Sequence, residues 1–214
     1  MDGVDPTELD AFVATCREAG CRNLVRCSSG NLSRRLEGDR MLATASRSWL
    51  ERLTPAEVCV CRLADGALLS GPRPTVEMGV HAEILRTRPE VEVVLHFQSP
   101  CATALACRAD AVDYRVIPEV PYYLGPVARV PYLPPGSDEL AVAVAAAMAE
   151  HDLVVLDHHG MVTVAGGYDA AIQNAEFFEL ACEVIVHGGE GVVPLAPEAV
   201  QALMAARRAA DGKV

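Results

Sequence analysis

The sequence predicts an α/β fold in three layers, an α/β/α arrangement with a central mixed, largely antiparallel sheet flanked by helices. Segments with helical periodicity alternate along the chain with short apolar strands. Several neighbouring strands are joined by short turns, without the crossover helix that a parallel pair requires. With 214 residues, 51% of them hydrophobic, the chain is expected to form one domain over residues 1–214 with a sizeable core.

Helices are predicted where apolar residues recur every three to four positions and where a capping residue or a proline begins the run. Asp5 and Pro6 mark the start of the first helix and Gly20 marks its end, while Ser137 caps a later one. The expected helices cover residues 5–20, 74–88, 100–108, 138–151, 168–187 and 197–211.

Strands are predicted at short apolar runs that are bounded by turn residues. Residues 57–63 and 67–70 alternate in hydrophobicity around the turn sequence ADG, which is typical of a hairpin. Continuous apolar runs indicate strands that are buried on both faces. The expected strands cover residues 41–44, 57–63, 67–70, 91–97, 153–157 and 161–165, and a proline-rich loop is expected over about 118–136.

The chain is acidic and almost free of lysine. It has 29 Asp and Glu against 18 Lys and Arg, a formal net charge of −11, so neither nucleic acid nor an anionic membrane is an expected partner. Lys213 is the only lysine and lies one residue from the end. A Schiff-base enzyme requires a lysine inside its pocket and a P-loop requires one beside its glycines, so neither mechanism is expected.

Eight cysteines are present, but they do not predict a disulfide framework. The N-terminal sequence MDGVDPTELD is acidic and lacks an apolar signal segment, so we expect free thiols in a cytoplasmic protein. No apolar run approaches the roughly 18 residues that a membrane span requires.

Two histidines follow apolar strands and are candidates for a metal site. His96 ends the run VEVVLHF, and Gln98 projects to the same face of an extended segment. His159 follows the run VVLDHH and precedes a glycine. Convergent imidazoles at strand ends suit a divalent cation, but the pattern alone also allows structural histidines with hydrogen-bond partners.

Other polar residues are compatible with an acid or base and with an anion pocket. Glu77 lies at the start of a predicted helix, and His81 follows one turn later. Glu77 is either a solvated residue of the first helical turn or a carboxylate beside a metal. The segment Ser28–Ser33 and the segment Thr44–Ser48 combine small residues, hydroxyls and Arg47. Such segments can bind an anion through amides, hydroxyls and a guanidinium, although they are common in proteins.

Taken in order, several blocks of the sequence resemble the class II aldolase/adducin family, which includes L-fuculose-phosphate aldolase. The resemblance covers about residues 7–190 and implies a class II aldolase-like fold. The matching blocks are SSGNLSRR, TASR at 44–47, PTVEMGVH at 74–81, RPEVEVVLHFQSPCATALA at 88–106, IPEVPYYL from 117, YLPPGSDELA from 132 and LDHHGMVTVAGGYDAAIQNAEFFE from 156.

The resemblance implies a role for each matching position. The zinc ligands of the family fall on His96, Gln98 and His159, and its acid/base glutamate, also a metal neighbour, falls on Glu77. A tyrosine that serves the substrate from a neighbouring subunit falls on Tyr122, or on Tyr123 if the register differs by one residue. The phosphate-binding residues of the family fall on Ser29, Gly30, Asn31, Ser46, Arg47 and Thr75.

Three departures from the family pattern affect these expectations. Gln98 stands where a second histidine is expected, and an amide oxygen is a poorer zinc donor than imidazole. Arg47 replaces a glycine and Val76 replaces a hydroxyl residue of the family's phosphate pocket. The anion that binds here is therefore either a carboxylate or a phosphate in a different orientation. No tyrosine follows Tyr168, whereas aldolases of the family can use one near the C-terminus.

The resemblance therefore implies a lyase with a divalent cofactor, Zn²⁺ being the first expectation. The expected reaction is retro-aldol cleavage of a small phosphorylated ketose through a metal-stabilised enediolate, by a homotetramer. The alternatives are a sugar-phosphate epimerase or dehydratase, or a non-catalytic binding domain like the adducin head. Retention of Glu77, His96 and His159 favours an enzyme, because polar groups are costly to bury without a purpose.

Overall fold

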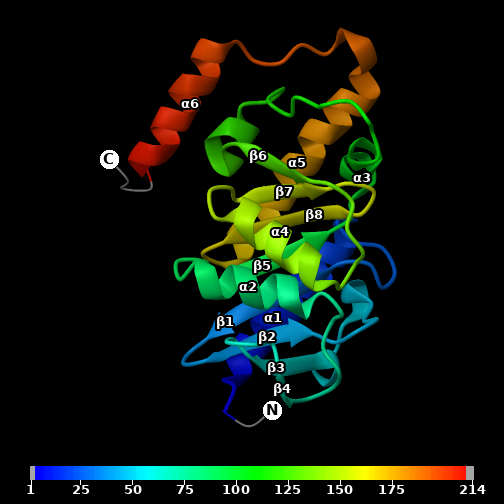
Figure 1. The fold of residues 1–214 in the computed structure, drawn as a ribbon, viewed down its shortest axis with the longest axis vertical. Helices are drawn as coiled ribbons and strands as arrows, with labels where there is room; N and C mark the ends of the chain where they lie inside the picture. The colour runs from blue at the N-terminus through cyan, green and yellow to red at the C-terminus, as the bar shows by residue number, and fades with distance from the viewer. Residues whose placement is uncertain (1–2, 211–214) are drawn as a thin grey trace.

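One eight-stranded sheet runs through the whole computed structural model, which describes residues 3–210 (Figure 1). Its strand order is β4-β3-β2-β1-β5-β8-β7-β6, and only the edge pair β6 and β7 is parallel. This confirms the predicted mixed, largely antiparallel sheet. The strands are β1 (Asn31–Leu36), β2 (Arg40–Thr44), β3 (Val58–Arg62), β4 (Leu68–Ser70), β5 (Val93–Phe97), β6 (Val127–Val130), β7 (Leu153–Leu156) and β8 (Gly160–Ala165).

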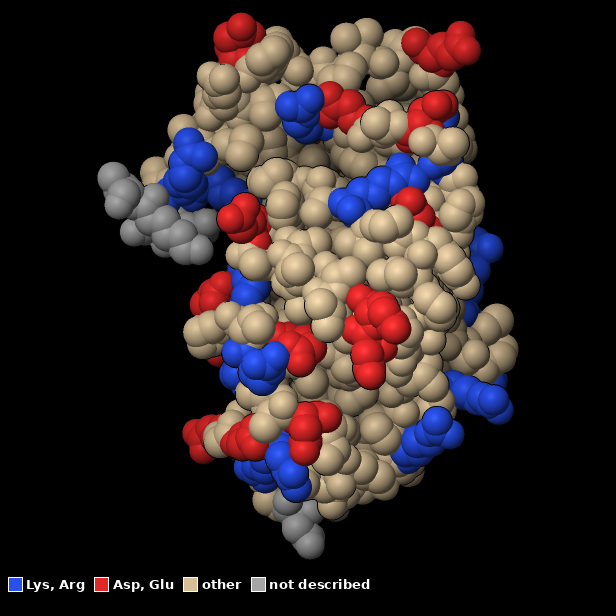
Figure 2. Space-filling model, viewed as in Figure 1, with Lys and Arg blue, Asp and Glu red and all other residues tan. Residues whose placement is uncertain are grey.

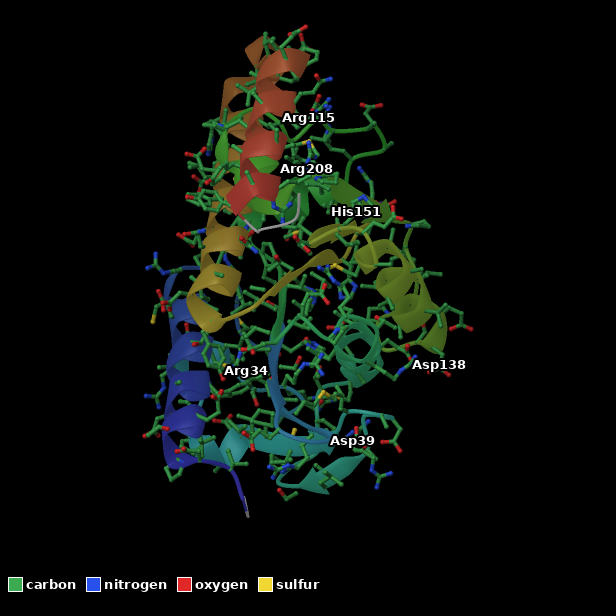
Figure 3. All side chains as sticks on the ribbon, turned by 90° about the vertical axis from the view of Figure 1, so that its left-hand side faces the viewer. Arg34, Asp39, Arg115, Asp138, His151 and Arg208 are labelled. Carbon is green, nitrogen blue, oxygen red and sulfur yellow. The ribbon has the colours of Figure 1, made fainter. Side chains whose placement is uncertain are left out.

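Helices cover both faces of this sheet and make the three layers that the sequence predicts (Figure 3). One face packs against α1 (Pro6–Cys21), α3 (Pro100–Ala106) and α5 (Tyr168–Gly188), and the other against α2 (Met78–Thr87) and α4 (Asp138–Met148). The C-terminal helix α6 (Pro197–Ala210) packs against the short π-helix η3 (Val120–Leu124). Within residues 3–210, no helix is both long enough and apolar enough to cross a membrane.

In strand β5, successive side chains point to opposite faces of the sheet and so divide the core into two layers. Leu95 and Phe97 belong to the cluster beneath α1 and α5, whereas Val94 belongs to the cluster beneath α2 and α4. His96 is two residues from Val94 and therefore points toward the α2 and α4 layer. All five residues of β5 are buried, as the continuous apolar run predicts.

Two strands are not among those predicted. β1 has the polar sequence NLSRRL, but it pairs with β2 on one side and β5 on the other. β6 and η3 lie inside the segment expected to be a proline-rich loop. Both strands depend on pairing with distant neighbours, which local hydrophobicity does not report.

The start of α2 also differs from the prediction. The helix begins at Met78, because Pro74 forms a bridge with Ala45 and the Thr75 amide donates to the Thr44 carbonyl. Glu77 is consequently the N-cap residue and not a residue of the first turn. Lys213 and the last residue of the expected 197–211 helix lie outside the described residues.

Glu179 of α5 caps the N-terminus of α3, which packs beside α5 on the same face of the sheet. Its carboxylate accepts hydrogen bonds from the Ser99 hydroxyl at 2.7 Å and from the backbone amides of Cys101 and Ala102, both at 2.8 Å. A buried carboxylate at a helix N-terminus satisfies amides that otherwise lack partners. This contact fixes α3, and hence the end of β5, to α5.

We expect Glu179→Gln to lower the free energy of unfolding by about 2 kcal/mol, because the amide group replaces one accepting oxygen with a donor. Glu183→Gln, an exposed change of the same kind one turn later, should alter it by less than about 0.5 kcal/mol. Equilibrium denaturation of both variants measures the difference. Equal values would show that the cap does not stabilise α3.

Candidate metal centre

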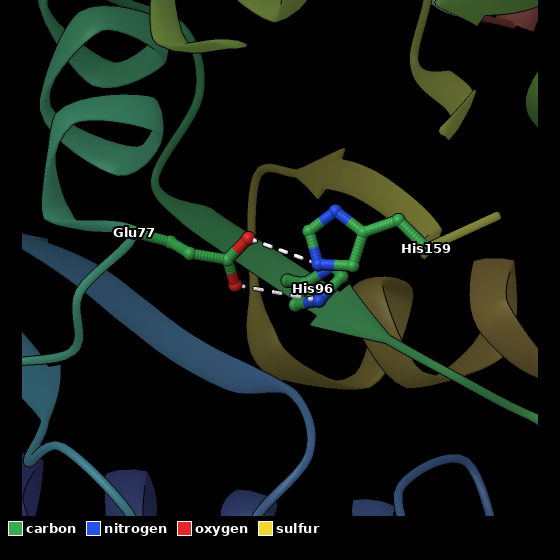
Figure 4. Close-up of side chains that lie close together, drawn as sticks. All are labelled: Glu77, His96 and His159. Atoms are coloured by element: carbon green, nitrogen blue, oxygen red, sulfur yellow. Dashed lines mark ion pairs between the residues drawn. The ribbon is translucent and has the colours of Figure 1, made fainter. Parts of the chain in front are cut away.

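Three side chains from separate elements converge at one end of the central strands β5 and β8: Glu77 at the N-cap of α2, His96 near the end of β5, and His159 in the turn between β7 and β8. Their candidate ligand atoms all lie within 4.8 Å of one another. Nε2 of His96 lies 3.4 Å from Oε2 of Glu77, and Nε2 of His159 lies 3.2 Å from Oε1 (Figure 4). The structure thus brings together three of the four residues expected to bind a metal.

A backbone carbonyl fixes the orientation of His96. Its Nδ1 donates to the carbonyl oxygen of Met161 at 2.9 Å, across the β5–β8 pair. In the neutral ring the proton is then on Nδ1, and the lone pair of Nε2 faces Glu77. Metal-binding histidines generally donate their other nitrogen to such an acceptor.

The turn before β8 delivers His159 because residue 160 has no side chain. A Cβ atom at Gly160 would lie 2.7 Å from the carbonyl oxygen of Phe97 and 3.0 Å from Cε1 of His96. Any other residue would push β8 away from the end of β5. His159 is nearly buried, and its Nδ1 has no hydrogen-bond partner among the described residues.

Electrostatics keep Glu77 ionised although only 6% of its surface is exposed. Burial by itself raises the pKa of Glu77, but the two histidines and a hydrogen bond from Asn31 outweigh it, so the pKa lies well below its usual range. Burial lowers the pKa of His96 and favours the neutral ring. An ionised carboxylate beside a neutral imidazole is the protonation state in which these groups bind a metal.

This donor set fits a divalent first-row cation. Tetrahedral zinc ligands at about 2.0 to 2.1 Å from the metal lie roughly 3.3 Å from one another, close to the separations between Glu77 and the two rings. Two imidazoles and one carboxylate also form the ligand set of several catalytic zinc sites, in which a position stays open for substrate.

Gln98 lies at the border of this cluster. Its side-chain amide nitrogen is 3.4 Å from Nε2 of His96, and the residue is half-buried. The side chain is therefore close enough to face a bound ion after rotation of its amide. Its assignment as a further ligand stays a prediction.

A cavity of about 240 Å³ opens above the three side chains. All the residues expected to bind the substrate anion line it, and Pro135, which the sequence did not single out, lines it as well. The predicted residues on its wall are Ser29, Gly30, Asn31, Ser46, Arg47, Thr75, Glu77, His96, Gln98 and His159.

Arg47 is exposed at this cavity in a backbone conformation that favours glycine, with φ 66°. Among residues 3–210, its side chain has no hydrogen-bond or ion-pair partner, so the guanidinium is available to a ligand. The lower right edge of Figure 2, over the segments between β2 and α2, carries basic side chains without acidic ones beside them. The rim of the cavity can therefore attract an anion despite the negative net charge.

Tyr122 is the one predicted site residue that the cavity of a single chain does not include. It lies in η3, where its ring contacts Tyr123 with centroids 4.8 Å apart. Its expected contribution from a neighbouring subunit stays a prediction. Ser33, predicted only as part of the candidate anion-binding segment Ser28–Ser33, is buried and does not line the cavity. The sequence analysis did not link it to Asn31, although the spacing Asn31-x-Ser33 places both side chains on one face of a strand.

Known proteins and solved structures resemble this chain over most of its length. The model of the Class II Aldolase and Adducin N-terminal domain matches residues 10–186. The chain is 34% identical over 162 residues to 3-oxo-tetronate 4-phosphate decarboxylase of Escherichia coli K12, covering 74% of this chain and 76% of that protein. It is 31% identical over 173 residues to L-fuculose phosphate aldolase of Methanococcus vannielii, covering 80% and 92%. The crystal structure of YgbL from Escherichia coli superposes with a TM-score of 0.87 at 27% identity, covering 92% of this chain and 98% of that one.

We expect protein purified without a histidine tag or chelator to contain about one equivalent of divalent metal per chain, and His159→Ala to lose it. His187→Ala, which changes an exposed histidine at the end of α5, should retain the metal. Elemental analysis of the three proteins measures the content. Metal retained by a folded His159→Ala protein would remove this residue from the site.

Proposed function

The chain belongs to the class II aldolase and adducin family, and from this premise we propose that it is a metal-dependent lyase that breaks a carbon–carbon bond in a small phosphorylated substrate. The observation that carries the proposal is the convergence of Glu77, His96 and His159 at the floor of a cavity whose rim presents Arg47. A binding domain without chemistry has no use for an ionised carboxylate buried between two imidazoles.

His96, His159 and Glu77 would hold the cation, with Gln98 as a further neighbour and Zn²⁺ as the expected metal. Such a cation supplies Lewis acidity, which stabilises the negative charge that reaches a carbonyl oxygen when an adjacent carbon–carbon bond breaks. Glu77 would exchange a proton with the carbon that keeps the bonding electrons. Arg47, Ser46, Thr75 and the amides near Gly30 would bind the anionic end of the substrate.

In the retro-aldol reaction, a phosphorylated ketose divides into an aldehyde and a ketone. The hydroxyl next to the breaking bond must lose its proton as the aldehyde forms, and the new carbanion equivalent must gain one. Glu77 would make the second transfer; because its carboxylate is ionised in the free protein, the proton that it passes to carbon would first come from solvent. Tyr122 would serve the first from a neighbouring subunit, which makes a homotetramer with shared sites part of this version of the proposal.

Decarboxylation of a phosphorylated 3-oxo acid is a second candidate, which one observation favours. Relatives 34% identical to this chain are named 3-oxo-tetronate 4-phosphate decarboxylase. Departing CO₂ carries no proton, so this reaction requires a single proton transfer, which would run from solvent through Glu77 to the carbon that loses CO₂.

The two reactions are distinguished by their products. Metal-loaded protein should release an aldehyde from a phosphorylated ketose such as L-fuculose 1-phosphate, or CO₂ from 3-oxo-tetronate 4-phosphate. Glu77→Gln should lower either rate by about 10²- to 10⁴-fold, because it removes the acid/base group. Enzyme-coupled assays for aldehyde and for CO₂ measure the rate of each reaction and show which one the protein catalyses. A metal-loaded protein that cleaves neither class of substrate contradicts the proposal.

We expect Arg47→Gly to raise KM for the phosphorylated substrate about tenfold to a hundredfold, because a charge-assisted contact contributes about 1.5 to 3 kcal/mol. The same change should leave the free energy of unfolding equal or slightly higher, because glycine adopts the positive φ of residue 47 without strain. Arg73→Gln, an exposed change that alters the net charge equally, is the control. Equal KM values for the two variants would show that Arg47 does not anchor the substrate.

A further inference from the structure

A chain of hydrogen bonds runs through the core beneath Glu77 and ends on its carboxylate. Ser33 Oγ lies 2.7 Å from Nδ1 of His81, and Nε2 of His81 contacts Oδ1 of Asn31. Nδ2 of Asn31 then donates to Oε2 of Glu77 at 2.8 Å. Ser33 and His81 are fully buried, and Asn31 is 6% exposed.

Rigid elements hold the members of this chain. Asn31 pairs with His96 across β1 and β5, and Ser33 follows two residues later on the same face. His81 lies on α2 one turn after Glu77, so the helix places both side chains toward that face. No member depends on a flexible loop.

The chemistry of each group fixes the direction of every bond. The amide NH₂ of Asn31 faces Glu77 and donates to its Oε2. The carbonyl oxygen of Asn31 therefore faces His81, whose Nε2 must donate. Burial lowers the pKa of His81 to about 4, so the ring is neutral at pH 7 and has one N–H. Nδ1 is then an acceptor, and the hydroxyl of Ser33 donates to it.

We infer that Ser33 and His81 are positioning residues, which hold Asn31 and through it Glu77 in the orientation that the metal centre uses. The inference rests on the proposed function, in which Glu77 both contacts the cation and moves a proton. Without the donor on His81, the amide of Asn31 can rotate by 180° and turn its oxygen toward the carboxylate. That rotation replaces the hydrogen bond with repulsion between Oδ1 of Asn31 and Oε2 of Glu77. The orientation of the Glu77 carboxylate is then no longer fixed by Asn31.

A purely structural role predicts a different result, because buried polar groups need partners in any core. In that case the loss of the hydrogen bond would lower stability but leave metal affinity unchanged. Thr163 provides the matched comparison: it is also a fully buried strand hydroxyl, and it donates to the Asp152 carbonyl at 2.9 Å, outside this chain of bonds.

The first measurement uses metal-free protein labelled with ¹⁵N-histidine. Long-range ¹H–¹⁵N correlation distinguishes the protonated from the unprotonated ring nitrogen, and the His81→Gln spectrum identifies the signals of His81 by their loss. We expect the proton on Nε2. A proton on Nδ1 overturns the inference, and neither result depends on the reaction or on metal binding.

The second measurement is metal affinity by competition with a chelator. His81→Leu should weaken binding about 10- to 100-fold, as when partners of metal ligands are removed. His81→Gln, which keeps a donor near the position of Nε2, should remain within about threefold of the unchanged protein, and Ser33→Ala should fall between the two. Thr163→Val should bind normally even if its unfolding free energy falls.

Wild-type affinity in a folded His81→Leu or Ser33→Ala protein overturns the inference, and Ser33→Ala keeps the test decisive if His81→Leu does not fold. A protein that binds no metal at all instead contradicts the proposed function, while the tautomer of His81 still reports on the chain of bonds. With saturating metal, the positioning variants should lower kcat more than they change KM, because Ser46, Arg47 and Thr75 of the anion pocket are unaltered.

Discussion

The buried, ionised carboxylate of Glu77 is the constraint on which the arrangement of this protein depends. A carboxylate removed from water is costly unless charges and donors surround it. Here Asn31 donates to the carboxylate, and ring nitrogens of His96 and His159 lie 3.4 and 3.2 Å from it, where a bound cation would supply the balancing charge. Each of these residues comes from a different strand or turn. The order β1-β5-β8 in the middle of the sheet is what makes this possible, because it sets the ends of three separate segments side by side beneath the start of α2.

The rigid and the adaptable parts of the site occupy different elements. The candidate metal ligands stand at the N-cap of α2, on β5 and in a tight turn, where Gly160 permits the strands to approach closely. Most of the groups that would bind the substrate anion lie on the loops before β1, after β2 and before α2. Sites on regular elements are held more accurately than sites on loops, whereas loops tolerate change. The departures Arg47 and Val76 are on the loops, which is consistent with a retained reaction centre and an altered substrate anchor.

Membership of the class II aldolase and adducin family and the local geometry point to the same general chemistry. Aldol cleavage and decarboxylation both leave electrons next to a carbonyl and both need one proton returned to carbon. The difference between them lies at the departing group, where only the aldol reaction needs a second acid or base. For this reason a second acid or base, the role proposed for Tyr122 of a neighbouring subunit, and not the metal centre, would separate the two reactions.

The sequence by itself determined the features that local physics controls. Caps, prolines and periodicity are properties of neighbouring residues, so α1, α4 and α5 were predicted closely, and the order of the motifs indicated Glu77, His96, His159 and the anion loops. Tertiary structure decided what depends on distant pairing. β1 is mostly polar and becomes a central strand only because β2 and β5 flank it, so the sequence did not predict that Ser33 is buried in the core. Whether His96 and His159 meet also depended on the order of strands in the sheet, because hydrogen bonding between strands links residues that the sequence keeps far apart.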